Sequence, residues 1–245
     1  MDGTPAPAPA PLSLLRPVRA GNAFEETVER LLQAVKLGVV AYGEKLPPER
    51  ELATRLGISR VTLREAIRAL QEAGYLDVRR GRYGGAFVVY RPPRPREGDL
   101  RRAVTRMGED ELEDALTFRM AVECGAARVL ATTELTPGQR ETLNARLAEV
   151  NDAAPADYRR GDIAFHLAIA ELTGSPRLAA ACADARLRVT DLLNAIPVLG
   201  PNIEHAAVQH AAIAAAILAG DPEAAGRAVA EHLEGTAALL RGFLA

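Results

Sequence analysis

Residues 44–89 read EKLPPERELATRLGISRVTLREAIRALQEAGYLDVRRGRYGGAFVV, and this stretch decides the fold of the first part of the chain. It predicts two short helices with a sharp turn between them, followed by a basic β-hairpin. The pair Pro47-Pro48 favours the start of the first helix, and Gly57 favours its end. Ser59 can cap the second helix through its hydroxyl, and Gly74 can end it in a left-handed conformation.

The second of these helices has two different faces. Apolar side chains recur on it at helical spacing, and we expect them to face a core: Leu63, Ala66, Ile67 and Leu70. Arg60, Arg64 and Arg68 stand four residues apart, so they form one exposed stripe on another side. A helix that is held by its back and presents guanidinium groups on its front has the form of a major-groove reader. For Arg68 the competing interpretation is a position too far along the helix to reach DNA.

The distribution of charge supports a nucleic-acid partner although the total charge does not. The 245 residues carry a formal net charge of −2, with 48% apolar and 25% charged residues. Residues 44–96 hold 12 Lys and Arg against 6 Asp and Glu, a net +6, which leaves −8 for the remainder. A basic segment joined to an acidic one fits a DNA-binding domain coupled to a second domain. An ordinary solvated surface is the alternative explanation of these charges.

One segment resembles the winged helix-turn-helix of GntR-family bacterial regulators in its residue types, their spacing and its helix-ending residues. This segment is PERELATRLGISRVTLREAIRALQEAGYL, and a basic wing that contains glycine follows it. The resemblance implies binding to double-stranded, palindromic operator DNA as a homodimer. It also implies that most DNA contacts come from the helix-turn-helix, with two more from the wing. The implied residues are Arg50, Ser59, Arg60, Val61, Thr62, Arg64, Arg80 and Gly81.

The composition of the chain and the positions of its Pro and capping residues predict its domain organisation. Many Ala and Leu residues favour helix. We predict a mostly α fold, with a disordered Pro- and Ala-rich tail at 1–20, the winged helix-turn-helix at 21–91 and a linker at 92–108. An antiparallel all-helical bundle of six to seven helices follows at 109–243. Its helices are expected at about 109–132, 137–151, 155–173, 176–196, 202–219 and 222–243. Three starts pair a capping side chain with Pro: Thr136-Pro137, Ser175-Pro176 and Asp221-Pro222.

Several classes of protein are disfavoured by the sequence. Cys124 and Cys182 lie in apolar helical sequence without a CxxC pattern, so we expect buried thiols and no disulfide. No run of 18 residues is apolar enough to predict a membrane span. The amino-terminal sequence has no basic start and is interrupted by Pro, which makes it a poor signal peptide. A cytoplasmic protein is therefore expected.

Three of the four histidines stand at positions that can converge. Asp162 and His166 are four residues apart, so they project from one face of a helix about one turn apart. His210 and His232 are each 11 residues from Asp221, so an antiparallel helical hairpin would hold them level. Three imidazoles and a carboxylate inside a bundle suit a divalent transition metal ion such as Zn, Ni or Mn. Taken singly, each histidine is equally consistent with a surface residue or a hydrogen-bonded core residue.

The segments AFHLAIAELTGSPRL and HAAIAAAILAGDPEAAGRAVAEHL resemble the all-helical effector domain of the FadR subfamily, called FCD. Many members bind a metal ion there, and the open positions of the metal receive a small carboxylate effector. The resemblance implies that the metal ligands are Asp162, His166, His210 and His232. It also offers Arg119 as an effector-binding residue that holds a carboxylate, for which the guanidinium fork is suited. A surface or interface salt bridge of Arg119 with Glu123 or Asp114 is the alternative.

The function predicted from these features is that of a transcription regulator, most simply a repressor, whose operator binding is controlled by a small organic acid at the metal site. A metal-dependent enzyme fused to a helix-turn-helix is one alternative, but no catalytic signature such as HExxH accompanies the ligands, so we expect no enzyme. The other alternative is an architectural DNA-binding protein with a structural metal ion.

Overall fold

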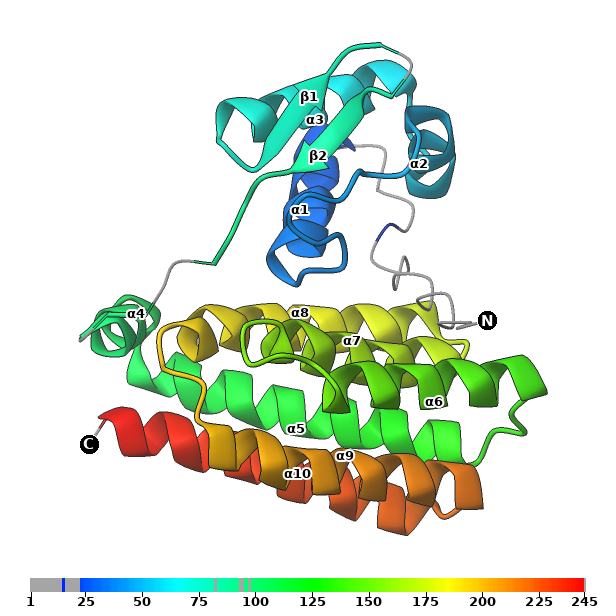
Figure 1. Ribbon diagram of the computed structural model, residues 1–245, viewed down its shortest axis with the longest axis vertical. Helices are drawn as coiled ribbons and strands as arrows, with labels where there is room; N and C mark the ends of the chain where they lie inside the picture. Colours follow the sequence, from blue (N-terminus) through cyan, green and yellow to red (C-terminus); the bar gives the residue numbers. More distant parts are fainter. Residues whose placement is uncertain (1–14, 16–22, 82, 93–94, 97, 245) are drawn as a thin grey trace, which may run out of the picture. The chain divides into compact units, whose positions relative to one another are not determined.

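The computed structural model describes residues 15, 23–81, 83–92, 95–96 and 98–244, and the tail predicted at 1–20 lies outside them except for Leu15. The described chain divides after Pro92 into two compact units, which are taken in turn. The predicted fold class is confirmed: a small unit with a helix-turn-helix and a hairpin precedes a unit built of helices (Figure 1).

The first unit contains three helices and one hairpin. In chain order these are α1 (Ala23–Lys36), α2 (Glu49–Leu56), α3 (Arg60–Glu72), β1 (Leu76–Arg79) and β2 (Gly85–Val88). The strands are antiparallel, with Leu76 opposite Val88 and Arg79 opposite Gly85. The core lies where α1 and α2 meet the apolar face of α3, and it contains Leu31, Leu52, Leu56, Leu63, Ala66, Ile67 and Leu70.

The predicted turn residues bound the helix-turn-helix as expected. Gly57 ends α2 with φ 66°, in the left-handed region that favours glycine. Ser59 begins α3, and its hydroxyl oxygen accepts a hydrogen bond from the backbone N–H of Thr62 at 3.0 Å. Gly74, with φ 80°, follows the end of α3. These caps fix where α3 starts, and so they fix the direction in which its arginines project.

Apart from one short helix at its start, the second unit is a bundle of long helices that run roughly parallel or antiparallel to one another (Figure 1). Its helices are α4 (Asp99–Met107), α5 (Glu109–Ala131), α6 (Pro137–Asn151), α7 (Tyr158–Leu172), α8 (Pro176–Asn194), α9 (Gly200–Ala219) and α10 (Pro222–Leu244). The last six begin and end within three residues of the predicted bounds. Helix α4 occupies part of the segment predicted as linker, so the sequence analysis missed it. Its Leu100 and Val104 are buried against the ends of α5, α8 and α10.

The core of the second unit follows from the apolar stripes of α5, α7, α9 and α10. Leu130, Phe165, Ile213 and Val229 are buried together in it. Cys124 and Cys182 are buried free thiols, as expected. Among the described residues, no helix combines the length and apolar character that crossing a membrane requires.

Candidate functional site

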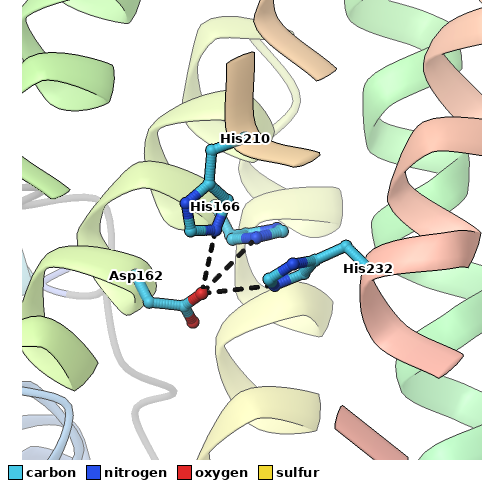
Figure 2. A group of neighbouring side chains, drawn as sticks. All are labelled: Asp162, His166, His210 and His232. Carbon is cyan, nitrogen blue, oxygen red and sulfur yellow. Dashed lines mark hydrogen bonds and ion pairs between the residues drawn. The ribbon is translucent and has the colours of Figure 1, made fainter. Parts of the chain in front are cut away.

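Helices α7, α9 and α10 bring four predicted side chains to one point inside the second unit. Asp162 and His166 project from one face of α7, while His210 comes from α9 and His232 from α10 (Figure 2). One candidate ligand atom from each residue lies within 4.8 Å of the others. The hairpin between α9 and α10 turns at Gly220, with φ 73°, and this turn holds the two histidines at the same height. We call these four residues the His/Asp cluster.

The three rings of the cluster converge on a single carboxylate oxygen. Asp162 Oδ1 lies 3.1 Å from His210 Nε2, 3.3 Å from His232 Nε2 and 3.9 Å from His166 Nε2. The three imidazoles are buried, and Asp162 is only slightly exposed. The same type of nitrogen from each histidine therefore points at one small volume beside the carboxylate (Figure 2).

Glu123 on α5 determines how His166 presents its ring. His166 Nδ1 lies 2.9 Å from Glu123 Oε2. A carboxylate can only accept a hydrogen bond, so Nδ1 carries the proton and Nε2 is left with a lone pair. This Nε2 is buried and has no hydrogen-bond partner among the described residues. A buried lone pair that faces a carboxylate oxygen is a position that a cation can occupy.

A second layer of buried charge supports the cluster. Arg186 on α8 donates from Nη1 to Asp162 Oδ2 at 2.9 Å and from Nη2 to Glu123 Oε2 at 2.7 Å. Arg119 on α5 donates from Nε to Glu123 Oε1 at 2.8 Å, and both residues of this pair are 3% exposed. Arg119 thus pairs with Glu123, but this pair is buried and is not the surface or interface salt bridge of the alternative interpretation. The same residue also lines the cavity beside the cluster.

Electrostatics favour the protonation states of Asp162 and His166 in which these two side chains can bind a metal ion. Burial would raise the pKa of Asp162, but Arg186 and the His210 and His232 hydrogen bonds hold this pKa well below its ordinary value. Burial likewise opposes ionisation of Glu123, and Arg186 and Arg119 keep the pKa of that carboxyl well below normal. Burial, followed by the charge of Arg186, lowers the pKa of His166 to about 3. The carboxylates are therefore ionised and His166 is neutral near neutral pH.

A cavity of about 220 Å³ opens beside the His/Asp cluster. Arg119, Asp162 and His232 line it, as do Tyr158 and Arg159 from the start of α7. His205 lines the cavity but is not part of the cluster, which agrees with its omission from the predicted ligands. The remaining lining is mostly uncharged and comes from α7 to α10: Ile163, Thr190, Leu193, Asn194, Asn202, Ala206, Gln209, Gly235, Thr236 and Leu239.

The residues present fit a divalent transition metal ion. Three imidazole nitrogens and one carboxylate oxygen are the donor set that Zn, Ni and Mn accept in proteins. Two buried ring nitrogens of the cluster, His166 Nε2 and His210 Nδ1, have no hydrogen-bond partner among the described residues. Of these, His166 Nε2 faces Asp162. Its orphaned lone pair is the observation that makes the cluster a metal-site candidate rather than a closed hydrogen-bond network.

Sequence reasoning missed Arg186 and did not use Glu123 except as a partner for Arg119. One signal for Arg186 was available. It stands among small and apolar residues on α8, where Ala183, Ala185 and Val189 are buried, so helical spacing places its guanidinium in the core. A buried arginine requires carboxylate partners, and Asp162 and Glu123 were available on neighbouring helices.

In the first unit, the residues predicted to contact DNA lie mainly on the surface. The side chains of Arg60 and Arg64 are 58% and 59% exposed, and Arg50, Ser59, Arg80 and Gly81 are also exposed. Val61 is exposed as well, whereas Thr62 is half-buried and its hydroxyl lies 2.9 Å from that of Ser59.

One acidic residue contacts both central arginines of this face. Glu49 Oε2 lies 2.8 Å from Arg64 Nε and 3.7 Å from Arg60 Nη2. Arg68 instead pairs with Glu72 on its own helix. Glu49 therefore links α2 to the arginine stripe at the two positions predicted to read base edges.

Comparison with known proteins assigns both units. Residues 24–88 match the bacterial regulatory proteins of the gntR family, and residues 114–235 match the FCD domain. The chain is 30% identical over 216 residues to the putative L-lactate dehydrogenase operon regulatory protein of Escherichia coli, covering 85% of this chain and 83% of that one. It is also 30% identical over 233 residues to the HTH-type transcriptional repressor NanR of Cronobacter sakazakii, covering 89% and 85%.

The fold is shared with a solved structure of E. coli McbR/YncC. The two chains are 23% identical, with a TM-score of 0.54, and the similarity covers 91% of this chain and 99% of that chain. The matched families and the named relatives are regulators of transcription and not enzymes.

Proposed function

Since this chain belongs to the GntR family of bacterial transcription regulators and carries an FCD domain, we propose that it is a cytoplasmic repressor whose operator binding is controlled by a small carboxylate metabolite. The metabolite binds in the cavity beside the His/Asp cluster, where a divalent transition metal ion is held by Asp162, His166, His210 and His232. The observation that carries this proposal is the convergence of three Nε2 atoms on Asp162 next to a cavity lined by Arg119.

The metal ion would supply a positive charge and open coordination positions for a carboxylate. The protein's own residues do the remaining work of binding and orientation. Glu123 fixes the ring of His166, and Arg186 fixes the carboxylate of Asp162. Arg119 uses Nε for Glu123, so the other two nitrogens of its guanidinium remain to hold the carboxylate of the effector. A metal ion in this role binds a ligand and needs no general base.

At the other unit, the proposal assigns base reading to Arg60 and Arg64 and positioning to the polar residues around them. Bidentate arginine contacts to guanine discriminate between bases by about 1–3 kcal/mol each. Arg50, Ser59 and Thr62 fit phosphate contacts, which orient the protein without specifying sequence. Val61 can contact a thymine methyl group, and Arg80 and Gly81 can follow the adjacent minor groove. Because one helix reads few base pairs, a twofold homodimer on a palindromic operator is required for useful specificity.

The test selects operator DNA from a random pool with the purified protein and then titrates the selected duplex in a gel-shift assay. Sugar acids, hydroxy acids and dicarboxylates are added with and without Zn, Ni or Mn. We expect at least one acid to change operator affinity by about 5- to 150-fold, and only when metal is present. Operator affinity that is indifferent to every acid, with metal bound, would instead identify an architectural DNA-binding protein with a structural ion.

A further inference from the structure

Arg159 is a partly buried cation in the cavity without a carboxylate partner. It stands in the first turn of α7 and lines the same cavity as Asp162 and Arg119. Its Nη2 donates to the backbone carbonyl of Ile196 at 2.9 Å. No carboxylate of the described residues lies within ion-pairing distance of its guanidinium, whose remaining nitrogens have no protein partner there.

The other arginines of low exposure in this unit do have carboxylate partners. Arg119, Arg146 and Arg186 are each buried, and each pairs with an Asp or Glu at 2.9 Å or less. Burial lowers the pKa of Arg159, and the negative charge of Asp162 opposes this decrease in pKa. A desolvated guanidinium without its own counter-ion is costly. An anionic ligand in the cavity would supply the missing partner.

The balance of charge around the cavity points to more than one negative group on that ligand. The two positive charges of Arg119 and Arg186 offset the negative charges of Glu123 and Asp162. The divalent ion of the proposed function adds two positive charges, and Arg159 adds a third. A monocarboxylate would leave two of these three charges without a counter-ion, whereas a dicarboxylate would leave only one.

The position of Arg159 sets the separation of the two anionic groups. Arg159 precedes Asp162 by three residues on α7, so the two side chains share a face and stand about 4.5 Å apart along the helix axis. We infer that the effector is a short dicarboxylate with one carboxylate at the His/Asp cluster and Arg119 and the other on Arg159. Chains of roughly four to six carbons span this separation. The cavity of about 220 Å³ suits such a molecule, because pockets for drug-sized ligands begin near ~300 Å³.

This inference rests on the proposed function, and its test uses pairs of acids that differ only in the second carboxylate. Malate is compared with 2-hydroxybutyrate, and succinate with butyrate, by calorimetry on the full-length protein loaded with Zn. We expect each diacid to bind about tenfold or more tightly than its partner, the typical effect of one charge-assisted contact. In Arg159→Gln this preference falls to about twofold or less while the affinity for 2-hydroxybutyrate is unchanged.

The control is Arg160→Gln, which removes the same charge from the next residue. Arg160 is exposed and lies 3.7 Å from Asp157, so this variant should keep the wild-type preference. Arg159→Lys keeps the charge and should retain part of it. If Arg159→Gln does not fold, the wild-type preference across both pairs decides alone. Equal binding of the two acids of each pair would overturn the inference and leave the proposed function standing. Failure of every acid to bind to metal-loaded protein would overturn both.

Discussion

The arginines of α3 are exposed to solvent, whereas the arginines around the His/Asp cluster are buried. Arg64 pairs with Glu49 at 2.8 Å, and the two side chains are 59% and 39% exposed. Arg186 pairs with Glu123 at 2.7 Å, and these side chains are 2% and 3% exposed. The distances are almost equal, but an exposed pair contributes about 0–1 kcal/mol, whereas breaking a buried pair costs about 3–5 kcal/mol.

Because of this difference in burial, we expect substitutions of the α3 arginines to change DNA binding without changing stability. Substitutions around the His/Asp cluster should change both ligand binding and stability. On α3 water solvates each guanidinium, so a side chain can leave Glu49 for DNA or be removed without harm to the fold. Around the His/Asp cluster the charged side chains are buried and paired with one another, so each charge is needed by at least one other. Substitutions at the two regions should therefore differ in what they change, and five experiments examine this in decreasing order of expected effect.

The largest effect is expected from Arg186→Met, which replaces the guanidinium by an apolar side chain of similar length. Glu123 and Asp162 would lose the charge that holds both of their pKa values down. We expect a loss of about 3–5 kcal/mol in the free energy of unfolding, measured by urea denaturation. The control is Arg188→Met, two residues away, where the exposed Arg188 pairs with Glu111 at 2.8 Å. Its expected cost is below about 1 kcal/mol, and equal losses in both variants would remove the distinction between the regions.

The next experiment is Arg64→Ala, which removes the central guanidinium of the α3 stripe. Operator affinity should fall by about 1–3 kcal/mol for each half-site, enough to abolish the gel shift of a dimer at working concentrations. The free energy of unfolding and the metal content should not change, because Arg64 is exposed. Arg68→Ala serves as the matched variant, since Arg68 pairs with Glu72 further along the helix and should affect binding little. Wild-type operator affinity in Arg64→Ala would remove Arg64 from the reading face.

The first unit was predictable from sequence because its structure depends on local signals. Gly57, Ser59 and Gly74 act on the few residues beside them, so caps and turns could be placed without knowledge of tertiary contacts. The starts of α6, α8 and α10 were predictable for the same reason, since each helix follows a capping residue and begins with a Pro. Helix α4 lacks such a start, and its N-cap is Gly98 without a side-chain hydrogen bond. The sequence of this segment therefore predicts a linker and not a helix.

The cluster was predictable only in part because it joins helices that are far apart in sequence. The spacing of Asp162 and His166 and the equal distances of His210 and His232 from Asp221 predicted that these four side chains converge. Nothing in that spacing gives the packing of α5 and α8 against α7, and this packing is what brings in the supporting charges. Glu123, Arg186 and Arg159 acquire their roles from neighbours on other helices, so their environment had to be seen in the structure.

The third experiment is Glu123→Gln, which changes a residue that contacts a predicted ligand and not the metal itself. The carboxylate orients His166 by accepting from Nδ1 at 2.9 Å. Losing such a contact typically lowers metal affinity 10- to 100-fold, and competition with a chromogenic chelator would measure it. The exposed Glu111, which pairs with Arg188, provides the control Glu111→Gln with unchanged metal affinity. Equal metal affinity in all three proteins would show that Glu123 does not position His166.

The fourth experiment follows the stability of the metal-free protein with pH. The pKa of His166 is about 3 in the folded chain against an ordinary 6.5, so between these values the unfolded chain binds the extra proton. Stability is therefore complete above pH 6.5 and declines as the pH falls through this window. We expect a loss of about 2 kcal/mol from this group between about pH 7.5 and about pH 5, measured by urea denaturation with a chelator present. His166→Gln should reduce that loss, and an identical pH profile in the variant would contradict the assignment.

The smallest effect is expected from Glu49→Gln, and it examines the exposed side of the comparison directly. The change frees Arg60 and Arg64 from the carboxylate that lies 3.7 Å and 2.8 Å from them. Because both pairs are exposed, the free energy of unfolding should change by less than about 1 kcal/mol. Affinity for unrelated duplex DNA should rise, because Arg60 and Arg64 no longer have to leave a protein carboxylate before they contact a phosphate. Fluorescence anisotropy at low salt would detect this rise. Glu51→Gln removes an equal charge from α2, and within the described part of the chain Glu51 pairs with Arg55 alone, so this variant corrects for net charge. A rise that is the same in both variants would mean that Glu49 acts through net charge alone and does not restrain the arginines of α3.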